Sequence, residues 1–109
     1  MAAATGDEPR IEIVDEPESG RYAISVDGEP AGFTRYRDRG EALAFVHTEI
    51  DDRFEGQGLG SRLISFALDD ARSRGLAVLP FCPFVRSYVQ RHREYVDLVP
   101  EEQRAQFGL

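Results

Sequence analysis

Four side chains in the second half of the sequence can move protons or attack a carbonyl carbon: His47, Glu49, Cys82 and Tyr88. His47 and Glu49 lie two residues apart in a predicted strand, so their side chains face the same side of it. Imidazole and carboxylate groups accept protons, which makes this pair a candidate general base. A solvated or capping polar pair at a strand end has the same pattern, and both interpretations stay open.

Cys82 and Tyr88 also have two interpretations each. Cys82 is the one cysteine of the chain and stands in the apolar stretch PFCPFV, so it forms no internal disulfide. In such surroundings a cysteine is usually a small core residue, but at the end of a predicted strand it is also a candidate nucleophile. Tyr88 either packs in the core beside Val85 and Val89 or exchanges a proton.

The stretch FEGQGLG places glycine at positions 56, 58 and 60, between a predicted strand and a predicted helix. The first N–H groups of a helix have no partner within the helix, and the helix dipole is positive there. Glycine lets a ligand approach the backbone, so this turn is typical of a phosphate site. A tight turn without a ligand explains the glycines equally well. The two common nucleotide motifs are excluded, because the chain has no lysine and its glycine spacing differs from Gly-x-Gly-x-x-Gly.

Composition indicates one globular domain. The 109 residues are 41% hydrophobic and 30% charged, with a formal net charge of −7 at pH 7. We expect a disordered tail over residues 1–9 and a single domain over 10–109. No basic block, long apolar run or signal-peptide pattern occurs, so we expect no nucleic-acid partner, no membrane span and a cytoplasmic location. No recognised metal-ligand spacing occurs, so no metal is expected.

Hydrophobic periodicity predicts an α/β (α+β) fold, an antiparallel meander followed by a β-α-β unit. Alternation predicts strands over 10–17, 21–28, 30–37 and 41–50, with Asp27-Gly28 as a two-residue hairpin turn. From Leu59 apolar residues, Phe66 among them, recur at helical spacing as far as Ala71, and Gly75 ends this helix. A strand over 76–81 is expected to pair parallel to 42–50. A short helix over 84–92 and a weakly helical or frayed tail over 101–109 complete the chain.

The turn Gly56-Gln57-Gly58-Leu59-Gly60, after an acidic strand end and before an amphipathic helix, resembles the acetyl-CoA loop of the GCN5-related N-acetyltransferases. The resemblance covers the order of elements over about residues 10–99, and its specific part is 47–95. Within the family the chain is most similar to the small single-domain group with a cysteine just after the post-helix strand. Glu55 departs from the family pattern, which has Arg or Gln at that position.

The resemblance implies a mixed sheet with acetyl-CoA wedged between strands 42–50 and 76–81. It implies that the pyrophosphate lies on backbone N–H groups of the glycine turn and that the pantetheine arm pairs with the strand edge near His47–Ile50. Cys82 would take the acetyl group or line the thioester, a glutamate near position 49 would be the base, and Tyr88 would protonate the departing thiolate. The cofactor-binding residues expected on this basis are Ile50, Gln57, Gly58, Leu59, Gly60, Ser61 and Arg86.

The function expected from these observations is acetyl-CoA-dependent transfer of an acetyl group to an unidentified amine, on a protein or peptide or in a polyamine. The first two predicted strands are joined by only a few residues, so the helices that cover the acceptor in larger relatives are absent. One alternative is a module that binds acetyl-CoA or coenzyme A with little turnover, and another is a plain interaction domain. We expect a monomer or a weak homodimer.

Overall fold

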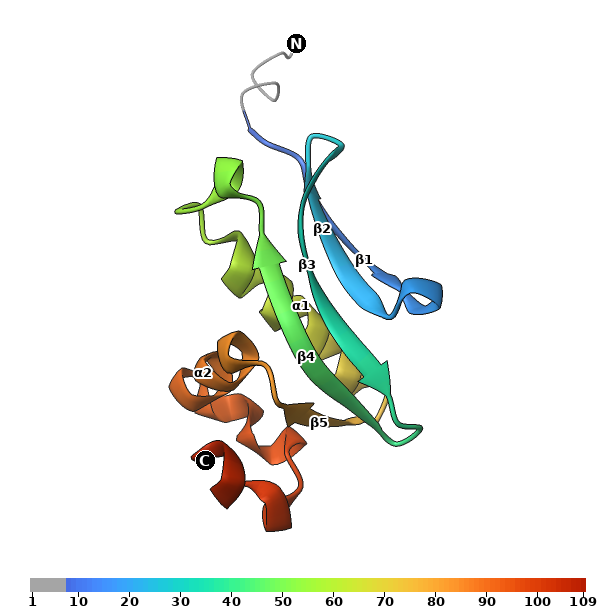
Figure 1. Ribbon diagram of the computed structural model, residues 1–109, viewed down its shortest axis with the longest axis vertical. Coiled ribbons are helices and arrows are strands. Elements are labelled where there is room, and N and C mark those ends of the chain that lie inside the picture. Colours follow the sequence, from blue (N-terminus) through green and yellow to red (C-terminus); the bar gives the residue numbers. More distant parts are fainter. Residues whose placement is uncertain (1–7) are drawn as a thin grey trace.

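The computed structural model describes residues 8–109, which form one five-stranded sheet with two α-helices (Figure 1). The strand order is β1-β2-β3-β4-β5. Most of the predicted tail over 1–9 lies outside the described residues. The elements are β1 (Ile11–Glu16), β2 (Arg21–Val26), β3 (Glu29–Asp38), β4 (Ala42–Ile50), α1 (Leu59–Ser73), β5 (Ala77–Pro80) and α2 (Pro83–Arg91).

The first four strands form the predicted antiparallel meander. Asp27 and Gly28 connect β2 to β3 with positive φ angles of 51° and 84°, which is the turn geometry that matches the twist of a hairpin. Alternate residues of β2, which are Tyr22, Ile24 and Val26, are buried against α1. The alternating pattern therefore places one sheet face on the core.

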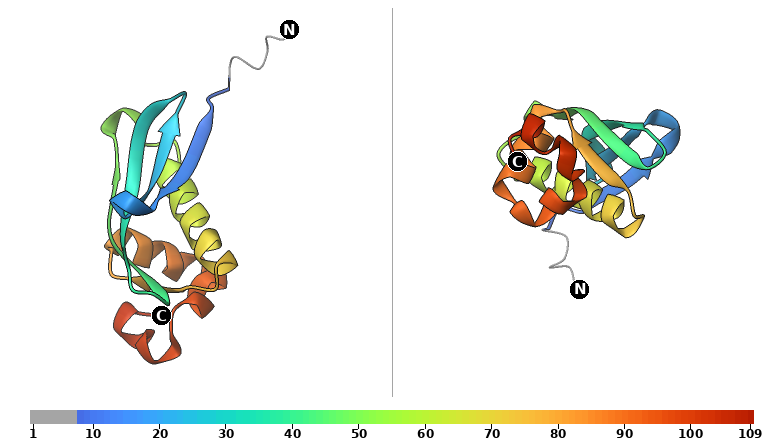
Figure 2. Two further views of the ribbon diagram at one scale, coloured as in Figure 1. Left: turned by 90° about the vertical axis from the view of Figure 1, so that its right-hand side faces the viewer. Right: turned by 90° about the horizontal axis from the view of Figure 1, so that it is seen from below.

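Helix α1 packs along one face of the sheet (Figure 2). Leu63, Ala67 and Ala71 are fully buried, as the periodicity predicts. Phe66 was expected in this stripe, but its side chain is 41% exposed and meets the ring of Tyr22 edge-on. Gly75 follows the helix with a φ of 70°, a conformation that ends helices.

Strand β5 pairs with β4 in parallel, as predicted, but over a short length. The register runs from Ala42 opposite Ala77 to Phe45 opposite Pro80. Strand β4 continues to Ile50, whereas β5 ends at Pro80. From residue 46 onward, one edge of β4 therefore has no strand neighbour among the described residues.

A β-bulge at Val46 determines which side chains of β4 face the helices. Phe45 pairs with Tyr36 and His47 with Arg35, so Val46 is one extra residue in β4. Phe45 faces α1 in the main core. Beyond the bulge, Thr48 faces the α1 side, opposite Thr34, whereas His47 and Glu49 face the other side of the sheet.

The C-terminal segment covers part of that second face at the β5 end (Figure 2). It consists of the 3-10 turns Arg93–Leu98, Glu101–Gln103 and Ala105–Phe107. Phe107 is only 3% exposed and packs with Val99, Ala44 and Leu79. The segment is thus packed rather than frayed. Its first turn contributes Tyr95 and Leu98 to the main core, whereas Val99 and Phe107 form the second, smaller core with Ala44 and Leu79.

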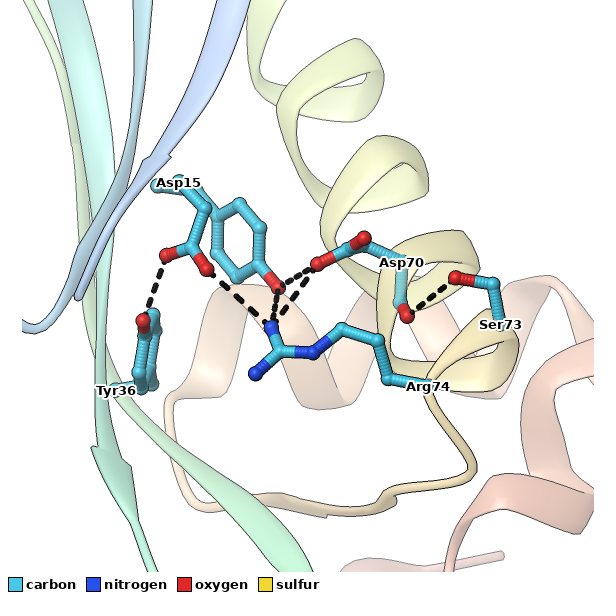
Figure 3. Close-up of polar contacts among 6 residues, drawn as sticks. Asp15, Tyr36, Asp70, Ser73 and Arg74 are labelled. Carbon is cyan, nitrogen blue, oxygen red and sulfur yellow. Dashed lines mark hydrogen bonds and ion pairs between the residues drawn. The ribbon is translucent and has the colours of Figure 1, made fainter.

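A polar network joins the sheet to the end of α1. Figure 3 shows Arg74 between Asp15 of β1 and Asp70 of α1, with N···O distances of 3.3 and 3.2 Å. The hydroxyl of Tyr36 donates to Asp15, and that of Tyr22 donates to Asp70, both at 2.6 Å. Burial first, and these carboxylate neighbours second, raise the pKa of both tyrosines well above the ordinary value. Both phenols therefore stay protonated donors in the folded protein.

Candidate active site

The glycine turn leads directly into an uncapped helix. Asp51 accepts a hydrogen bond from the N–H of Arg53 and starts a 3-10 turn over Asp52–Phe54. Gly56 and Gly58 follow with φ angles of 83° and 75°, which other residues adopt at a cost. Gly58 is the N-cap of α1 and offers no side-chain acceptor. The N–H groups of residues 59–61 therefore have no partner within the helix and no side-chain cap.

Gly60 is glycine for a different reason. Its backbone is helical, and a Cβ atom there would lie 2.6 Å from Cζ of Phe84. The Phe84 ring, at the start of α2, thus rests on the first turn of α1. Of the other expected cofactor-binding residues in the turn, Gln57 and Ser61 are exposed, whereas the Leu59 side chain is buried in the core.

His47 and Glu49 form the pair that their spacing predicts. Nε2 of His47 lies 2.7 Å from Oε2 of Glu49, and the two side chains are 54% and 61% exposed. The ring of Phe33 on β3 lies beside His47, with 6.0 Å between ring centroids. The pair is therefore held in one geometry on the sheet face that α1 does not cover.

A hollow of about 410 Å³ occupies this open face next to Glu49. Apolar side chains form part of it, and carboxylates stand on opposite sides, on β1 and at the end of β4. The guanidinium groups of Arg21 and Arg35 lie over the Phe33 ring, 5.4 and 5.3 Å from its centroid. The hollow is lined by the carboxylates of Glu12, Glu16, Glu49 and Asp51, by Arg21, and by apolar residues that include Val14, Ala23 and Phe33.

Cys82 lies on the opposite side of β4 from the His47–Glu49 pair. It is the N-cap of α2 and only 3% exposed. Its backbone N–H donates to the carbonyl of Phe45 at 2.8 Å, and its Sγ donates to Oγ1 of Thr48 at 3.4 Å. The structure thus places Cys82 beside the unpaired edge of β4, where the resemblance expects a thioester, but separates it from both predicted bases.

Tyr88 is buried on α2, with 6% of its surface exposed. Its ring stacks on His92, with centroids 3.9 Å apart and an angle of 16° between the planes. Within residues 8–109 its hydroxyl forms no hydrogen bond, unlike the hydroxyl of the neighbouring Tyr95, which donates to Asp69. Packing in the core, one of the two interpretations of Tyr88, therefore describes the ring, and the hydroxyl is left without a protein partner.

Arg86 carries a buried polar atom without a partner. Its Nη2 donates to the carbonyl of Phe81 at 3.2 Å, but Nε is buried and unbonded among the described residues. No carboxylate of residues 8–109 lies within ion-pair distance of it, although the chain is strongly acidic. This buried N–H is therefore available to an acceptor from outside the chain, such as an ordered water or a ligand oxygen.

Sequence reasoning missed three residues of this region. Thr34 and Thr48 contact each other at 2.8 Å, and Thr48 contacts Cys82. Gly32 leaves room for the backbone of β4, because a Cβ there would collide with the carbonyl oxygen of Glu49. A glycine inside a predicted strand was the one available sign of this close approach. The contact between Thr48 and Cys82 requires the bulge at Val46, and no residue type in the sequence indicates that bulge.

Ile50, the last residue of β4 and one of the expected cofactor-binding residues, is partly buried and packs against the main core. Within residues 8–109 no cluster of three or more His, Cys, Asp or Glu side chains is placed to hold a metal ion. None of the described helices is long and apolar enough to cross a membrane.

Comparison with known proteins identifies the family. The family model described as GCN5-related N-acetyl-transferase matches residues 21–98, from the start of β2 to the end of the first C-terminal 3-10 turn. This segment includes every candidate site residue and more than half of the chain. Among curated proteins, none is significantly similar. With the mixed five-stranded sheet, the match shows that the chain belongs to the GCN5-related N-acetyltransferases.

Proposed function

We propose that the protein transfers an acetyl group from acetyl-CoA to a cationic amine that approaches from the open face of the sheet. The observation that carries this proposal is that β5 stops pairing with β4 before β4 ends, and that β4 then leads into the uncapped end of α1. Strand pairing ends at Phe45 and Pro80, and the free edge of β4 then runs toward the glycine turn. Family membership indicates the general acetyltransferase activity, and this geometry is the reason for proposing acetyl-CoA as the cofactor.

Three features of the chain fit acetyl-CoA. The free N–H groups at residues 59–61 suit the diphosphate. The edge of β4 from His47 to Ile50 has backbone groups that suit the amides of the pantetheine arm. Arg86 has a buried, unpaired Nε and no carboxylate partner among the described residues. When bound, acetyl-CoA would supply the activated acetyl group.

The chain itself contributes acid–base chemistry on the open face. An acceptor amine reaches the site as an ammonium ion and has to lose a proton before it attacks. Glu49 borders the hollow, and Nε2 of His47 lies 2.7 Å from its carboxylate, so the pair is placed to take that proton. Because Cys82 lies on the other side of β4, the proposal requires the neutral amine to reach the thioester around the free edge of this strand. The hollow has an apolar floor and the four carboxylates of Glu12, Glu16, Glu49 and Asp51, against one guanidinium, that of Arg21, which pairs with Glu16. This excess of negative charge favours a flexible cation, such as a polyamine or a lysine side chain.

Cys82 is proposed to line the thioester rather than to take the acetyl group. A nucleophilic thiol is normally hydrogen-bonded to its base. The contact of Cys82 is instead Thr48, and the His47–Glu49 pair lies across the sheet. Tyr88, whose hydroxyl has no protein partner among the described residues, stays the predicted proton donor for the departing thiolate.

Binding is tested at Ser61, an exposed residue in the first turn of α1. Ser61→Glu adds a carboxylate that suits the helix dipole, so the fold is retained, but it competes with a bound diphosphate. We expect coenzyme A to bind at least tenfold more weakly to Ser61→Glu by calorimetry, and Ser61→Gln to bind nearly as well as the unchanged protein. Equal affinity in Ser61→Glu and Ser61→Gln would rule out a diphosphate at this helix end.

Turnover is tested by the release of free thiol from acetyl-CoA in the presence of spermidine or a lysine-containing peptide. Release that depends on the amine supports the transferase. Binding of coenzyme A without amine-dependent release identifies the alternative, a module that holds the cofactor. If coenzyme A does not bind at all, the interpretation as a plain interaction domain is favoured. Mass spectrometry after incubation with acetyl-CoA tests Cys82 separately, and a stable acetyl group on its sulfur would contradict the role proposed here.

A further inference from the structure

Thr34 is a fully buried threonine on the α1 side of the sheet. Its exposed fraction is 0%, and it is the one buried polar or charged residue in the part of the chain that the structure describes. Threonine at this position carries a hydroxyl that valine would replace at nearly equal volume. A buried hydroxyl costs free energy unless it is hydrogen-bonded, so its partner shows what it does there.

The partner of Thr34 is Thr48, directly opposite it on β4. Their Oγ1 atoms are 2.8 Å apart, and Thr48 in turn lies 3.4 Å from Sγ of Cys82. The three side chains form one line of contacts from the middle of the sheet to the start of α2. The line ends at the thiol.

The backbone holds Cys82 against the same strand. Its N–H donates to the carbonyl of Phe45 at 2.8 Å, just before the bulge at Val46, while its Sγ reaches Thr48 just after it. Without the extra residue, Thr48 would face the open side and could not meet the thiol. The bulge and the two threonines therefore all contribute to the position of the Cys82 side chain.

We propose that Thr48 is a positioning residue whose hydroxyl, held by Thr34, orients the Cys82 thiol at the open end of the β4–β5 pair. The role of that thiol toward acetyl-CoA rests on the proposed function, but the orientation itself does not. Thr34 and Thr48 form a pair that can reverse its direction of donation. When Cys82 is a thiol, its S–H group donates to Oγ1 of Thr48. When Cys82 is a thiolate, Thr48 can donate to the sulfur while Thr34 donates to Thr48.

The test uses the infrared S–H stretching band, which belongs to Cys82 alone because the chain has one cysteine. Thr48→Val removes the acceptor, so we expect the band to move to higher frequency, as for a thiol without a hydrogen bond. Thr48→Ser keeps the hydroxyl and is expected to restore the band of the unchanged protein. Thr34→Val, which leaves Thr48 without support, is expected to give a smaller shift in the same direction.

An unchanged band in Thr48→Val that has folded by circular dichroism would overturn the proposal, and an unchanged band in Thr34→Val would remove Thr34 from it.

A second measurement uses acetyl-CoA affinity. Thr48→Val and Cys82→Ala are each expected to weaken binding about fivefold, and the double variant no more than Cys82→Ala alone. Additive losses would show that Thr48 acts independently of the thiol. If acetyl-CoA does not bind at all, the proposed function fails, but the infrared result still decides the positioning role.

Discussion

His47 and Glu49 keep one geometry although more than half of each side chain is exposed. The strand places both on one face, and Phe33 limits the movement of the imidazole from the side. Because the pair is exposed and lies outside both hydrophobic cores, we expect its substitution to affect activity more than folding. The pair is therefore the place where an effect on activity can be separated from an effect on stability.

Glu49→Gln keeps the size and a hydrogen-bonding group but removes the negative charge. We expect kcat for the amine-dependent reaction to fall about 10²-fold or more, because a general base contributes that much, with the melting temperature almost unchanged. His47→Gln is expected to give a comparable loss. The matched control is Glu12→Gln, on β1 at the far side of the same hollow, which changes KM for the amine rather than kcat. A Glu49→Gln protein with full kcat would exclude Glu49 as the base.

The buried tyrosines at the end of α1 give the protein a pH dependence at alkaline pH. Tyr22 and Tyr36 have pKa values raised above the ordinary 10.0, by burial first and by Asp70 and Asp15 second. Above pH 10 the unfolded chain loses these protons while the folded protein keeps them. The unfolded state then binds fewer protons, so the free energy of unfolding falls as the pH rises.

The double variant Tyr22→Phe/Tyr36→Phe tests this assignment. Urea denaturation at pH 9, 10 and 11 should show a shallower decline for the variant above pH 10, by about 1.4 kcal/mol per pH unit for each tyrosine removed. At neutral pH the variant is expected to be less stable, because Asp15 and Asp70 lose donors. Equal slopes for both proteins would show that these phenols do not control alkaline unfolding.

At the scale of elements, the strands and helices could be predicted largely from the sequence. The turn at Asp27-Gly28, the helix from Leu59 and the parallel pairing of β5 all follow from local patterns that the structure confirms. The bulge at Val46 could not be predicted. Valine is a typical residue of regular strands, so its presence gives no sign of an irregularity. The bulge decides which face His47 and Thr48 occupy, so the sequence could propose His47, Glu49 and Cys82 as candidates but could not predict that Cys82 lies across the sheet from the other two.

Gly32 and Gly60 each lie where two elements pack closely, but we expect an alanine substitution to reduce stability much more at Gly32 than at Gly60. In Gly32→Ala the new methyl group meets the carbonyl of Glu49 on the neighbouring strand, and backbone cannot move aside cheaply. We expect a loss of about 2 kcal/mol in the free energy of unfolding, together with reduced activity from a displaced Glu49.

In Gly60→Ala the methyl group meets the tip of the Phe84 ring, which is 41% exposed and free to swing away. Alanine also favours the helix by about 1 kcal/mol over glycine, so the net change is expected to lie within about 1 kcal/mol. Urea denaturation of the two variants checks the contrast. A Gly60→Ala protein that is less stable than Gly32→Ala would contradict the assigned role of Phe84.

At the scale of the whole molecule, the C-terminal segment covers the β5 end of the sheet face opposite α1 and leaves the His47–Glu49 end open. Phe107 and Val99 pack on Ala44 and Leu79, and the ring of Phe81 meets Phe107 edge-on, with 5.2 Å between centroids. The segment was expected to be weakly helical or frayed, because short 3-10 turns have little periodicity to recognise. Its long-range packing, rather than its local sequence, keeps it in place.

The net charge of −7 acts on the two substrates in opposite directions. A cationic amine is drawn toward the acidic protein over a distance that salt shortens, and the Debye length falls to about 10 Å at 0.1 M. The proposed cofactor, acetyl-CoA, is anionic and would be repelled at long range, so under the proposed function its binding depends on local contacts at the helix end and at Arg86. Salt therefore weakens the attraction of the amine and reduces the repulsion of the cofactor at the same time.

We expect KM for spermidine to rise about threefold or more between 20 and 300 mM NaCl, while KM for acetyl-CoA changes less over the same range. Initial rates at saturating concentrations of the other substrate measure each constant separately. The variant Glu12→Gln/Glu16→Gln removes charge from the β1 side of the hollow and leaves the His47–Glu49 pair intact. Its KM for spermidine is expected to depend less on salt. If the salt dependence of the variant equals that of the unchanged protein, the amine does not enter across this face, and an acceptor site elsewhere on the molecule would have to be sought.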